Sequence, residues 1–395
     1  MTARPLVDMG ELAPYAGPDR IAALHPEERA LRVIWDDGRE SRFHWTWLRD
    51  HCACPECRHP QTRERLFELR DLPLPIGPAS AELEENGTLC LNWPARDSAS
   101  AHQSRFDPGW LRWRAYDSAS RSERVRPRQP WSVKTLGQVP EYSYERFKEA
   151  AEIQRAWIES LQQYGAVLLR GAPAQAGELE RFASAVAPIH ETHFGRIFDV
   201  QTKPDPNNAA YTSLALEPHV DLPNHPHPPD IQLLFCIANE ADGGDSTLVD
   251  GLQVAESLRK DHPESFHVLT TQAIDFRFQD AKVDICHRVP LIELDSQGAV
   301  TGLRFNNWIR DSLDLPEDEV ERYYSAYQQL WRALCHPDNQ LGLRLAAGDI
   351  LAFDNRRVLH GRTAFTANGR RHLQGCYLPR SMVESRLRLL ERQGS

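Results

Sequence analysis

Long hydrophobic runs are missing from this 395-residue sequence. A helix that crosses a bilayer needs about 20 consecutive apolar residues, and no stretch approaches that length. The first residues, Met1 to Pro5, also contain no apolar run of the kind that a targeting segment carries. The sequence therefore predicts a soluble protein without a membrane partner.

An excess of basic residues is missing as well. The chain has 46 lysines and arginines against 56 aspartates and glutamates, which gives a formal net charge of −10. Nucleic acids and anionic membranes select basic surfaces, so we expect neither as a partner. Hydrophobic residues make up 41% of the chain, which is ordinary for a globular protein. The length suits two domains.

Cysteines are few and unevenly placed. Of the eight, Cys52, Cys54 and Cys57 lie in one short stretch and the others are scattered. A secreted disulfide framework would spread pairs through a shorter chain, so we expect a reducing compartment, the cytoplasm. A structural zinc ion takes four ligands. The three thiolates therefore need a fourth, which could be His51, His59 or a histidine brought close by folding.

The N-terminal part has the pattern of a β module. Alternating apolar and polar residues at 31–35 and 41–45 flank a turn at 36–38, which is a hairpin signature. Another strand is expected at 88–93. We predict a small, mostly β domain over 20–117 and a serine- and proline-containing linker over 118–141.

The pattern changes to helical near residue 142. Phe147, Ala150, Ile153, Trp157 and Leu161 recur at spacings of three and four, as on one face of a helix. Gly165 is expected to end that helix. Further helices and short apolar strands follow, so 142–395 reads as an α+β domain. Several folds fit this pattern, among them the jelly roll.

One short stretch in this domain, residues 217–221, carries a possible metal site. Side chains two residues apart in a strand point to the same face, so His219 and Asp221 can bind one ion together. His360 is the candidate for a third ligand. Two imidazoles and one carboxylate leave other metal positions open, which is typical of non-haem Fe(II) oxygenases. Because the chain has 16 histidines, His-x-Asp alone is a weak signal.

A second alternating stretch lies at 370–377. On a strand, Arg371 and Tyr377 share one face. A guanidinium binds a carboxylate through two parallel hydrogen bonds, so Arg371 suits the far end of a dicarboxylic cosubstrate. The alternative is that Arg371 is a surface residue in a basic run with Arg370 and His372.

Several stretches in fixed order carry a family resemblance: residues 207–212, 219–221, 227–234, 243–251, 305–307, 353–355 and 371–377. Together they resemble the gamma-butyrobetaine hydroxylase family. That family consists of 2-oxoglutarate-dependent dioxygenases and is related to taurine dioxygenase and trimethyllysine dioxygenase. The resemblance implies a double-stranded β-helix (jelly roll) catalytic domain at 142–395, a zinc-binding N-terminal domain and a homodimer.

The resemblance also implies roles for individual residues. Fe(II) would be bound by His219, Asp221 and His360. Arg371 would pair with the 5-carboxylate of 2-oxoglutarate, with Ser246, or alternatively Thr247, adding a hydroxyl beside it. Ascorbate would serve as reductant. His102 would complete the structural zinc site with Cys52, Cys54 and Cys57.

The implied substrate site combines rings and amides. A quaternary ammonium group is attracted to ring faces without a hydrogen bond, and the positions that match such a cage are Phe194, Phe198, Tyr211 and Tyr377. Two of them are Phe where the animal enzymes carry Tyr and Trp. Asn208 and Asn306 match amides that bind the substrate carboxylate, to which an amide donates without adding charge.

The expected reaction is hydroxylation of gamma-butyrobetaine at C3 to carnitine, with consumption of dioxygen and 2-oxoglutarate and release of succinate and carbon dioxide. The alternative within the class is a sister hydroxylase of another quaternary amine, a trimethylammonio-phosphonate or trimethyllysine. From another class, a non-catalytic jelly roll that binds a betaine is the alternative, although a binder has no need of open metal positions.

Overall fold

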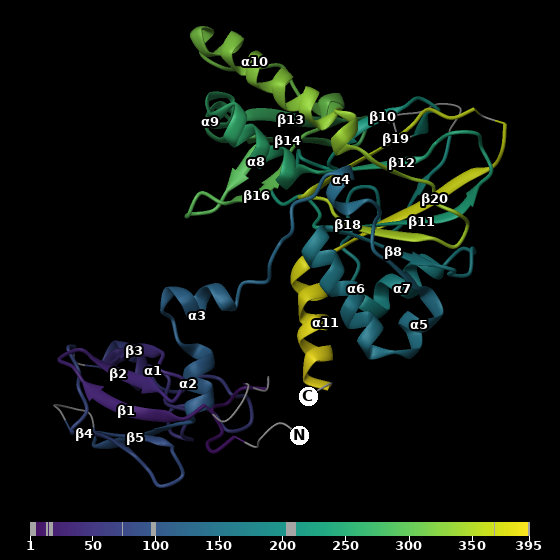
Figure 1. The fold of residues 1–395 in the computed structure, drawn as a ribbon. Helices are drawn as coiled ribbons and strands as arrows, with labels where there is room; N and C mark the ends of the chain where they lie inside the picture. Colours follow the sequence, from purple (N-terminus) through teal and green to yellow (C-terminus); the bar gives the residue numbers. More distant parts are fainter. Residues whose placement is uncertain are drawn as a thin grey trace. The chain divides into compact units, whose positions relative to one another are not determined.

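A computed structural model describes residues 5–12, 15, 19–72, 74–95, 100–202, 211–366 and 368–393 (Figure 1). The chain divides into two compact units, Met1–Arg126 with Glu391–Ser395 and Pro127–Leu390. The division falls inside the segment 118–141, which contains the short helices α3 (Ser118–Glu123) and α4 (Val133–Leu136). The exact limits 20–117 and 142–395 remain predictions.

The first unit consists of two small antiparallel sheets with short helices. Strands β1 (Ile21–Pro26), β2 (Ala30–Trp35) and β3 (Glu40–His44) form one sheet, and β4 (Ser80–Leu83), β5 (Leu89–Trp93) and β6 (His102–Phe106) form the other. The predicted hairpin is confirmed, with β2 paired to β3 and Gly38 at φ +81° in the turn. The helical segments are α1 (Trp45–Asp50), η1 (Leu69–Asp71) and α2 (Pro108–Arg114). Both sheets contribute to one aromatic core that includes Trp35, Phe43, Phe106 and Trp110.

Two β-sheets form the centre of the second unit. The larger has the order β7 (Glu141–Ser143), β8 (Ala166–Arg170), β18 (Ile350–Asp354), β11 (Ile231–Asn239), β20 (Arg371–Leu378), β9 (Phe198–Val200). The smaller has the order β10 (Leu216–His219), β19 (Val358–Arg362), β12 (Ser246–Asp250), β17 (Leu341–Leu343). All pairs are antiparallel except β7 with β8.

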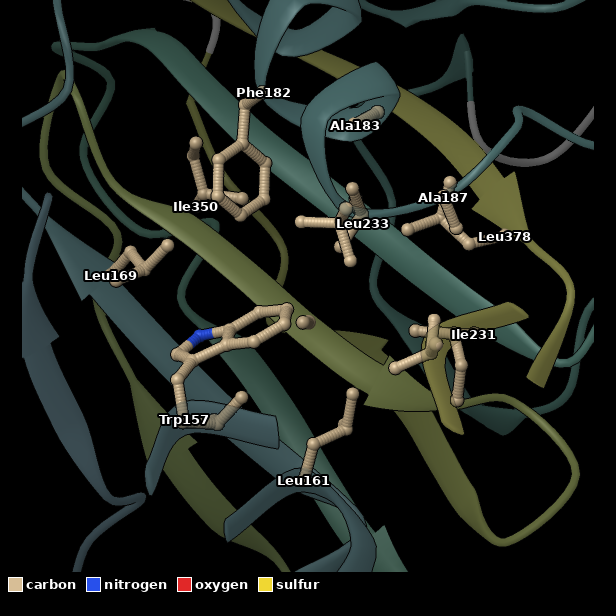
Figure 2. Packing of buried hydrophobic residues seen from close by; sticks show 14 of the residues in the cluster. Trp157, Leu161, Leu169, Phe182, Ala183, Ala187, Ile231, Leu233, Ile350 and Leu378 are labelled. Atoms are coloured by element: carbon tan, nitrogen blue, oxygen red, sulfur yellow. The ribbon is translucent and has the colours of Figure 1, made fainter. Parts of the chain in front are cut away.

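Helices cover the outer face of the larger sheet. These are α5 (Tyr144–Glu149), α6 (Ala151–Tyr164), α7 (Glu178–Val186) and α11 (Arg380–Gln393). Figure 2 shows Trp157 and Phe182 from these helices packed with Leu233 and Ile350 from the strands. The helix predicted from Phe147 to Leu161 is divided in two, because Ala150 has an extended backbone. Gly165 ends α6 in the left-handed region at φ +76°, as predicted.

Alternation along the strands gives the larger sheet two different faces. Ile231, Leu233 and Phe235 of β11 belong to the core under the helices. Leu234 of the same strand packs with Leu248 and other residues of the smaller sheet. The inner faces of the two sheets therefore face each other, which is where residues 219, 360 and 371 also lie.

The remaining elements lie around the smaller sheet. Two hairpins are formed by β13 (Ile274–Gln279) with β14 (Asp284–Val289) and by β15 (Ile292–Leu294) with β16 (Val300–Leu303). They share a core with the helices α8 (Gly251–Asp261), α9 (Pro263–Thr271) and α10 (Glu317–Leu334). The short 3-10 helices η3 (Asn307–Ile309) and η4 (Pro337–Asn339) complete the unit as described. None of the described helices is both long and apolar enough to cross a bilayer.

Candidate functional site

A pocket of about 480 Å³ opens between the two sheets. Both sheets line it, through Gln232 of β11, Ser246 of β12, His360 of β19 and Tyr377 of β20. The wall also includes Phe278 from the β13–β14 hairpin. Residues from distant parts of the chain thus meet in one cavity, where polar groups lie beside aromatic rings.

Three potential metal ligands lie together in this pocket. His219 ends β10, and its residue pair on the neighbouring strand β19 is His360. The Nε2 atoms of His219 and His360 lie 3.6 and 3.8 Å from Oδ1 of Asp221, and the two imidazole rings are 4.3 Å apart. The structure therefore brings the three predicted iron ligands into one cluster, in which each offers a ligand atom.

The protonation states suit a metal ion. Burial, assisted by His219, lowers the pKa of His360 to about 3, so this imidazole is neutral. Burial acts to raise the pKa of Asp221, but the two imidazoles and hydrogen bonds from Tyr377 and Gln232 outweigh it and the pKa is lowered. His219 Nδ1 lies 2.9 Å from the Glu217 carbonyl oxygen, to which it can donate, and its Nε2 faces Asp221. Neutral imidazoles and an ionised carboxylate are the forms that bind metals.

Asn355 fixes the backbone at Asp221. This fully buried side chain accepts from the Asp221 amide at 2.7 Å and donates to the Asp221 carbonyl at 3.0 Å and the Pro229 carbonyl at 3.0 Å. Both backbone groups of the predicted ligand are thus held by one side chain from the turn before β19. Leu222, the next residue, is in the left-handed region at φ +56°, an unusual conformation for a residue with a branched side chain.

Arg371 lies in the same pocket with few partners. Its Nη2 donates to the Gly244 carbonyl at 3.3 Å, and its buried Nε has no hydrogen-bond partner. No ion pair involves this arginine within the described ranges. Gly244 has φ +73°, and a Cβ there would lie 2.8 Å from Arg371 Nε. Arg371 is therefore partly buried beside a glycine and lines the pocket, where its guanidinium can take a carboxylate.

Ser246 lines the pocket, is buried and lies directly opposite Arg362 in the paired strands. Thr247 is the next residue on β12 and faces the other way, since alternate residues of a strand point to opposite faces. The position of Ser246 thus matches the predicted place beside the cosubstrate better than that of Thr247 does.

All four predicted cage residues, Phe194, Phe198, Tyr211 and Tyr377, line the pocket. The rings of Phe198 and Tyr377 are 5.2 Å apart. Gly375 is the residue opposite Phe198 in the β20–β9 pair, and a Cβ there would lie 2.4 Å from the phenyl ring. This glycine therefore gives Phe198 the space to turn its ring toward Tyr377.

Of the two amides predicted to bind the substrate carboxylate, the structure describes only Asn306. Asn208 lies outside the described residues. Asn306 lines the pocket and is buried, but its Nδ2 donates to the Val220 carbonyl at 3.2 Å and its Oδ1 accepts from the Trp308 amide at 3.1 Å. Asn306 thus supports the chain next to His219 and Asp221, and one amide hydrogen remains for a ligand.

A second cluster of potential metal ligands lies in the first unit. His102 Nε2 is 3.3, 3.7 and 3.5 Å from the Sγ atoms of Cys52, Cys54 and Cys57. A tetrahedral zinc ion with bonds of about 2.3 Å to sulfur and 2.0 Å to nitrogen would place S and N about 3.5 Å apart. The Cys3His cluster is therefore compatible with zinc and has no position left for a substrate.

The two other histidines considered for the zinc site lie outside the Cys3His cluster. His51 Nδ1 contacts the Trp47 carbonyl at 2.8 Å, and His51 stacks on the Trp47 ring. His59 Nδ1 accepts from the backbone amides of Gln61 and Thr62. Their nitrogen atoms are used locally, which leaves His102 as the fourth potential ligand.

Comparison with known proteins extends the resemblance. Residues 124–377 match the family described as Taurine catabolism dioxygenase TauD, TfdA family. Residues 22–112 match the family Gamma-butyrobetaine hydroxylase-like, N-terminal. The chain belongs to the TauD/TfdA dioxygenase family. Membership covers the unit that holds His219, Asp221 and His360, whereas the Cys3His cluster lies in the second matched region.

Full-length relatives of this TauD/TfdA member include gamma-butyrobetaine dioxygenase from Pseudomonas sp. (strain AK-1), 37% identical over 92% of this chain and 94% of the relative. The Homo sapiens gamma-butyrobetaine dioxygenase is 32% identical over 92% of this chain and 95% of the relative. Trimethyllysine dioxygenase, mitochondrial, from Bos taurus is 31% identical over 93% of this chain and 89% of the relative. A solved asparagine oxygenase in complex with Fe(II), 2S,3S-3-hydroxyasparagine and succinate has a TM-score of 0.47, with 20% identity over 58% of this chain and 78% of that chain.

The pocket of this TauD/TfdA protein contains an arginine that the sequence-based reasoning missed. Arg362 is buried, lines the pocket and donates to the carbonyls of Thr212 and Leu214 at 2.5 and 3.4 Å. Burial and, to a smaller extent, the nearby Arg371 lower the pKa of Arg362 to about 10. Alternation from His360 could have found it, because residues 360 and 362 share one face of a strand.

Two aromatic residues of the pocket were missed too. Phe278 lies 5.7 Å from Phe194, and Trp308 lies 5.3 Å from the His219 ring at an interplanar angle of 84°. Phe278 alternates with Ile274 and Phe276 and therefore looks like an ordinary core residue of a strand. Trp308 directly follows the family stretch 305–307, which was the available signal. The pocket thus has a tryptophan, Trp308, outside the four predicted cage positions.

Replacing Cys54 with serine should release zinc and destabilise the first unit. A serine hydroxyl is a poor zinc ligand, and structural zinc contributes directly to folding. We expect zinc content to fall to near zero and the first thermal transition to drop by roughly 10 °C or more, as a loss of ~2 kcal/mol would produce. Metal analysis and calorimetry of the full chain measure both.

Cys90→Ser is the matched control, because Cys90 is buried in the same unit but lies outside the Cys3His cluster. It should keep its zinc. A normal zinc content in Cys54→Ser would refute the assignment of the site.

Proposed function

We propose that this protein is an Fe(II)- and 2-oxoglutarate-dependent dioxygenase that hydroxylates gamma-butyrobetaine at C3 to give carnitine. The observation that carries the proposal is the content of one pocket. It holds the cluster of His219, Asp221 and His360, a partly buried arginine without an ion pair in the described part of the chain, and four rings at the predicted cage positions. Relatives named gamma-butyrobetaine dioxygenase, with similarity along nearly the whole chain, support the same substrate.

His219, Asp221 and His360 would hold Fe(II), since two imidazoles and one carboxylate leave other metal positions open for 2-oxoglutarate and dioxygen. When bound, Fe(II) would supply the chemistry by which dioxygen and 2-oxoglutarate give succinate and carbon dioxide and an unactivated C–H bond is hydroxylated. The protein determines which carbon is presented. Burial keeps the His360 imidazole neutral, and the neighbouring imidazoles and hydrogen bonds lower the pKa of the Asp221 carboxyl, so these two groups have the protonation states that metal binding requires.

Arg371 would bind the 5-carboxylate of 2-oxoglutarate. Its unpaired Nε and the Nη group on the same side form the fork that matches two carboxylate oxygens. The low dielectric of the site strengthens that pairing, since burial already lowers the pKa of Arg371. Ser246, buried on β12 of the smaller sheet, would donate its hydroxyl to the same end of the cosubstrate.

The rings would hold the trimethylammonium group of the substrate. Phe198 and Tyr377 pack together on one side of the pocket, and Phe194 lies with Phe278 in another aromatic pair. Cation–π attraction does not need a donor on the ligand, so these rings suit a cation that can make no hydrogen bond. The substrate carboxylate would meet Asn306 and Asn208, although only the former lies in the described chain.

We also propose that the two facing sheets are a double-stranded β-helix. Successive strands support this: β10, β11 and β12 alternate between the smaller and larger sheets, and so do β17, β18, β19 and β20. Such alternation makes the chain wind around the space between the sheets, where the pocket lies. Three further predictions belong to this proposal: ascorbate as the reductant, a cytoplasmic location, which the eight free cysteines favour, and a homodimer.

The test is an assay of the purified protein with Fe(II), ascorbate, oxygen and 2-oxoglutarate, with and without gamma-butyrobetaine. Succinate and product mass are followed together. We expect succinate formation to depend on the betaine, with one oxygen atom gained by the substrate for each succinate. The control without Fe(II) should give neither product.

Other results separate the alternatives. Succinate without oxidation of the betaine would refute the substrate, and trimethyllysine and the phosphonate analogue would then be assayed. Absence of succinate with every substrate would favour a betaine-binding protein without catalysis.

A further inference from the structure

The two oxygen atoms of the Asp221 carboxylate have different neighbours. Oδ1 lies 3.6 and 3.8 Å from the Nε2 atoms of His219 and His360. Oδ2 instead accepts a hydrogen bond of 2.8 Å from the hydroxyl of Tyr377. The two oxygens are therefore differentiated, with one facing the imidazoles and the other bound to a phenol.

Gln232 lines the same pocket and is among the groups that lower the pKa of the Asp221 carboxylate, as a hydrogen-bond donor would. An ionised carboxylate only accepts, so the glutamine amide must donate. Gln232 is 1% exposed and is the direct partner of Tyr377 in the β11–β20 pair. Residues opposite each other on paired strands face the same side of the sheet. The two donors are thus neighbours, and both are fixed by the larger sheet.

The ring and the hydroxyl of Tyr377 contact different residues. The ring packs against Phe198 at 5.2 Å and lines the pocket. The hydroxyl is bonded to Asp221. The side chain is 2% exposed, so the ring cannot move far without disturbing the hydrogen bond. Tyr377 therefore belongs both to the proposed aromatic cage and to the surroundings of the proposed metal site.

We propose that Tyr377, together with Gln232, is a positioning residue for Asp221 and transmits occupancy of the substrate cage to the metal site. The hydrogen bond occupies Oδ2 and leaves Oδ1, which faces the two imidazoles, as the oxygen that would bind Fe(II). A cation seated on the ring restrains Tyr377 and thereby the carboxylate. This coupling rests on the proposed function, whereas the effect on metal binding does not.

The deciding variant is Tyr377→Phe, which keeps the ring and removes only the hydroxyl. Loss of an outer partner of a metal ligand typically lowers metal affinity by about 10- to 100-fold. We expect that loss for Fe(II) titrated anaerobically in the absence of substrate. We also expect several times more succinate per hydroxylated product than in the wild type, while the KM for gamma-butyrobetaine changes by less than about threefold because the ring remains.

Two further variants complete the experiment. Gln232→Leu removes the second donor and should weaken Fe(II) binding in the same direction. Tyr323→Phe removes a buried hydroxyl of α10 that has no hydrogen-bond partner in the described part of the chain and lies outside the pocket lining, and should leave Fe(II) affinity unchanged. If either Tyr377→Phe or Gln232→Leu fails to fold, the other still decides the question.

The outcomes distinguish this proposal from the proposed function. Wild-type Fe(II) affinity in both Tyr377→Phe and Gln232→Leu would overturn the positioning role, even if the wild type hydroxylates the betaine. A rise in the KM for the betaine alone would also overturn it, because the hydroxyl would then serve only the cage. Weakened Fe(II) binding in these variants would support it even if the wild type does not turn over gamma-butyrobetaine, which would count only against the substrate.

Discussion

His219→Ala is expected to abolish turnover while the protein keeps its zinc. His219 is buried in the cluster with Asp221 and His360, and its loss removes a direct ligand of the proposed iron site. Removing even an outer partner of a ligand costs about 10- to 100-fold in metal affinity or activity, so loss of the ligand itself should cost considerably more. Iron and zinc contents, measured with betaine-dependent succinate formation, test both parts of the prediction.

The matched control is His267→Ala, since His267 is exposed on α9 and lies outside both metal clusters. It should keep both metals and full activity. Substantial activity in His219→Ala would remove this residue from the proposed ligand set. Loss of zinc together with iron would instead point to general unfolding.

Arg371→Gln should raise the KM for 2-oxoglutarate by about 30-fold or more. Glutamine preserves some hydrogen bonding but loses the charge and the fork, and loss of one partner of a buried, hydrogen-bonded charge pair costs at least ~2 kcal/mol. The KM for the betaine should change much less, because the rings that line the other part of the pocket are unaltered. Steady-state kinetics with each substrate varied separately give both constants.

Arg370→Gln tests the same change one residue away on an exposed arginine. Its KM for 2-oxoglutarate should match that of the wild type. Equal effects of the two substitutions would mean that the positive charge of the basic run matters and that the position of Arg371 in the pocket does not.

Local sequence patterns predicted much of the second unit. The alternation in 371–377 placed Arg371 and Tyr377 on one face, and both line the pocket. The position of Gly165 predicted the end of α6. Such signals act over a few residues, because helix and strand periods determine which side chains share a face. The same reasoning missed the break at Ala150, where the apolar spacing continues although the helix does not.

The residues alone left the zinc site open. His51, His59 and more distant histidines all satisfied the ligand count, and only the family resemblance pointed to His102. In the structure His102 begins β6 and contacts all three cysteines. The nearer histidines are engaged with the backbone of their own loops. Proximity in sequence was therefore a poor guide, because short loops use their own polar side chains to satisfy backbone groups.

The amino-acid sequence was enough to predict the types of ligand and the family, from a His-x-Asp pair, a distant histidine, an arginine on an alternating strand and a cysteine-rich stretch. The folded chain was needed to show that His360 is the strand partner of His219, that the Tyr377 hydroxyl bonds to Asp221, and that Arg362, Phe278 and Trp308 share the pocket. The physical reason is that periodicity is local, whereas contacts between distant strands depend on pairing and register. Register is specified by burying the apolar faces of whole sheets, a property that no single stretch contains.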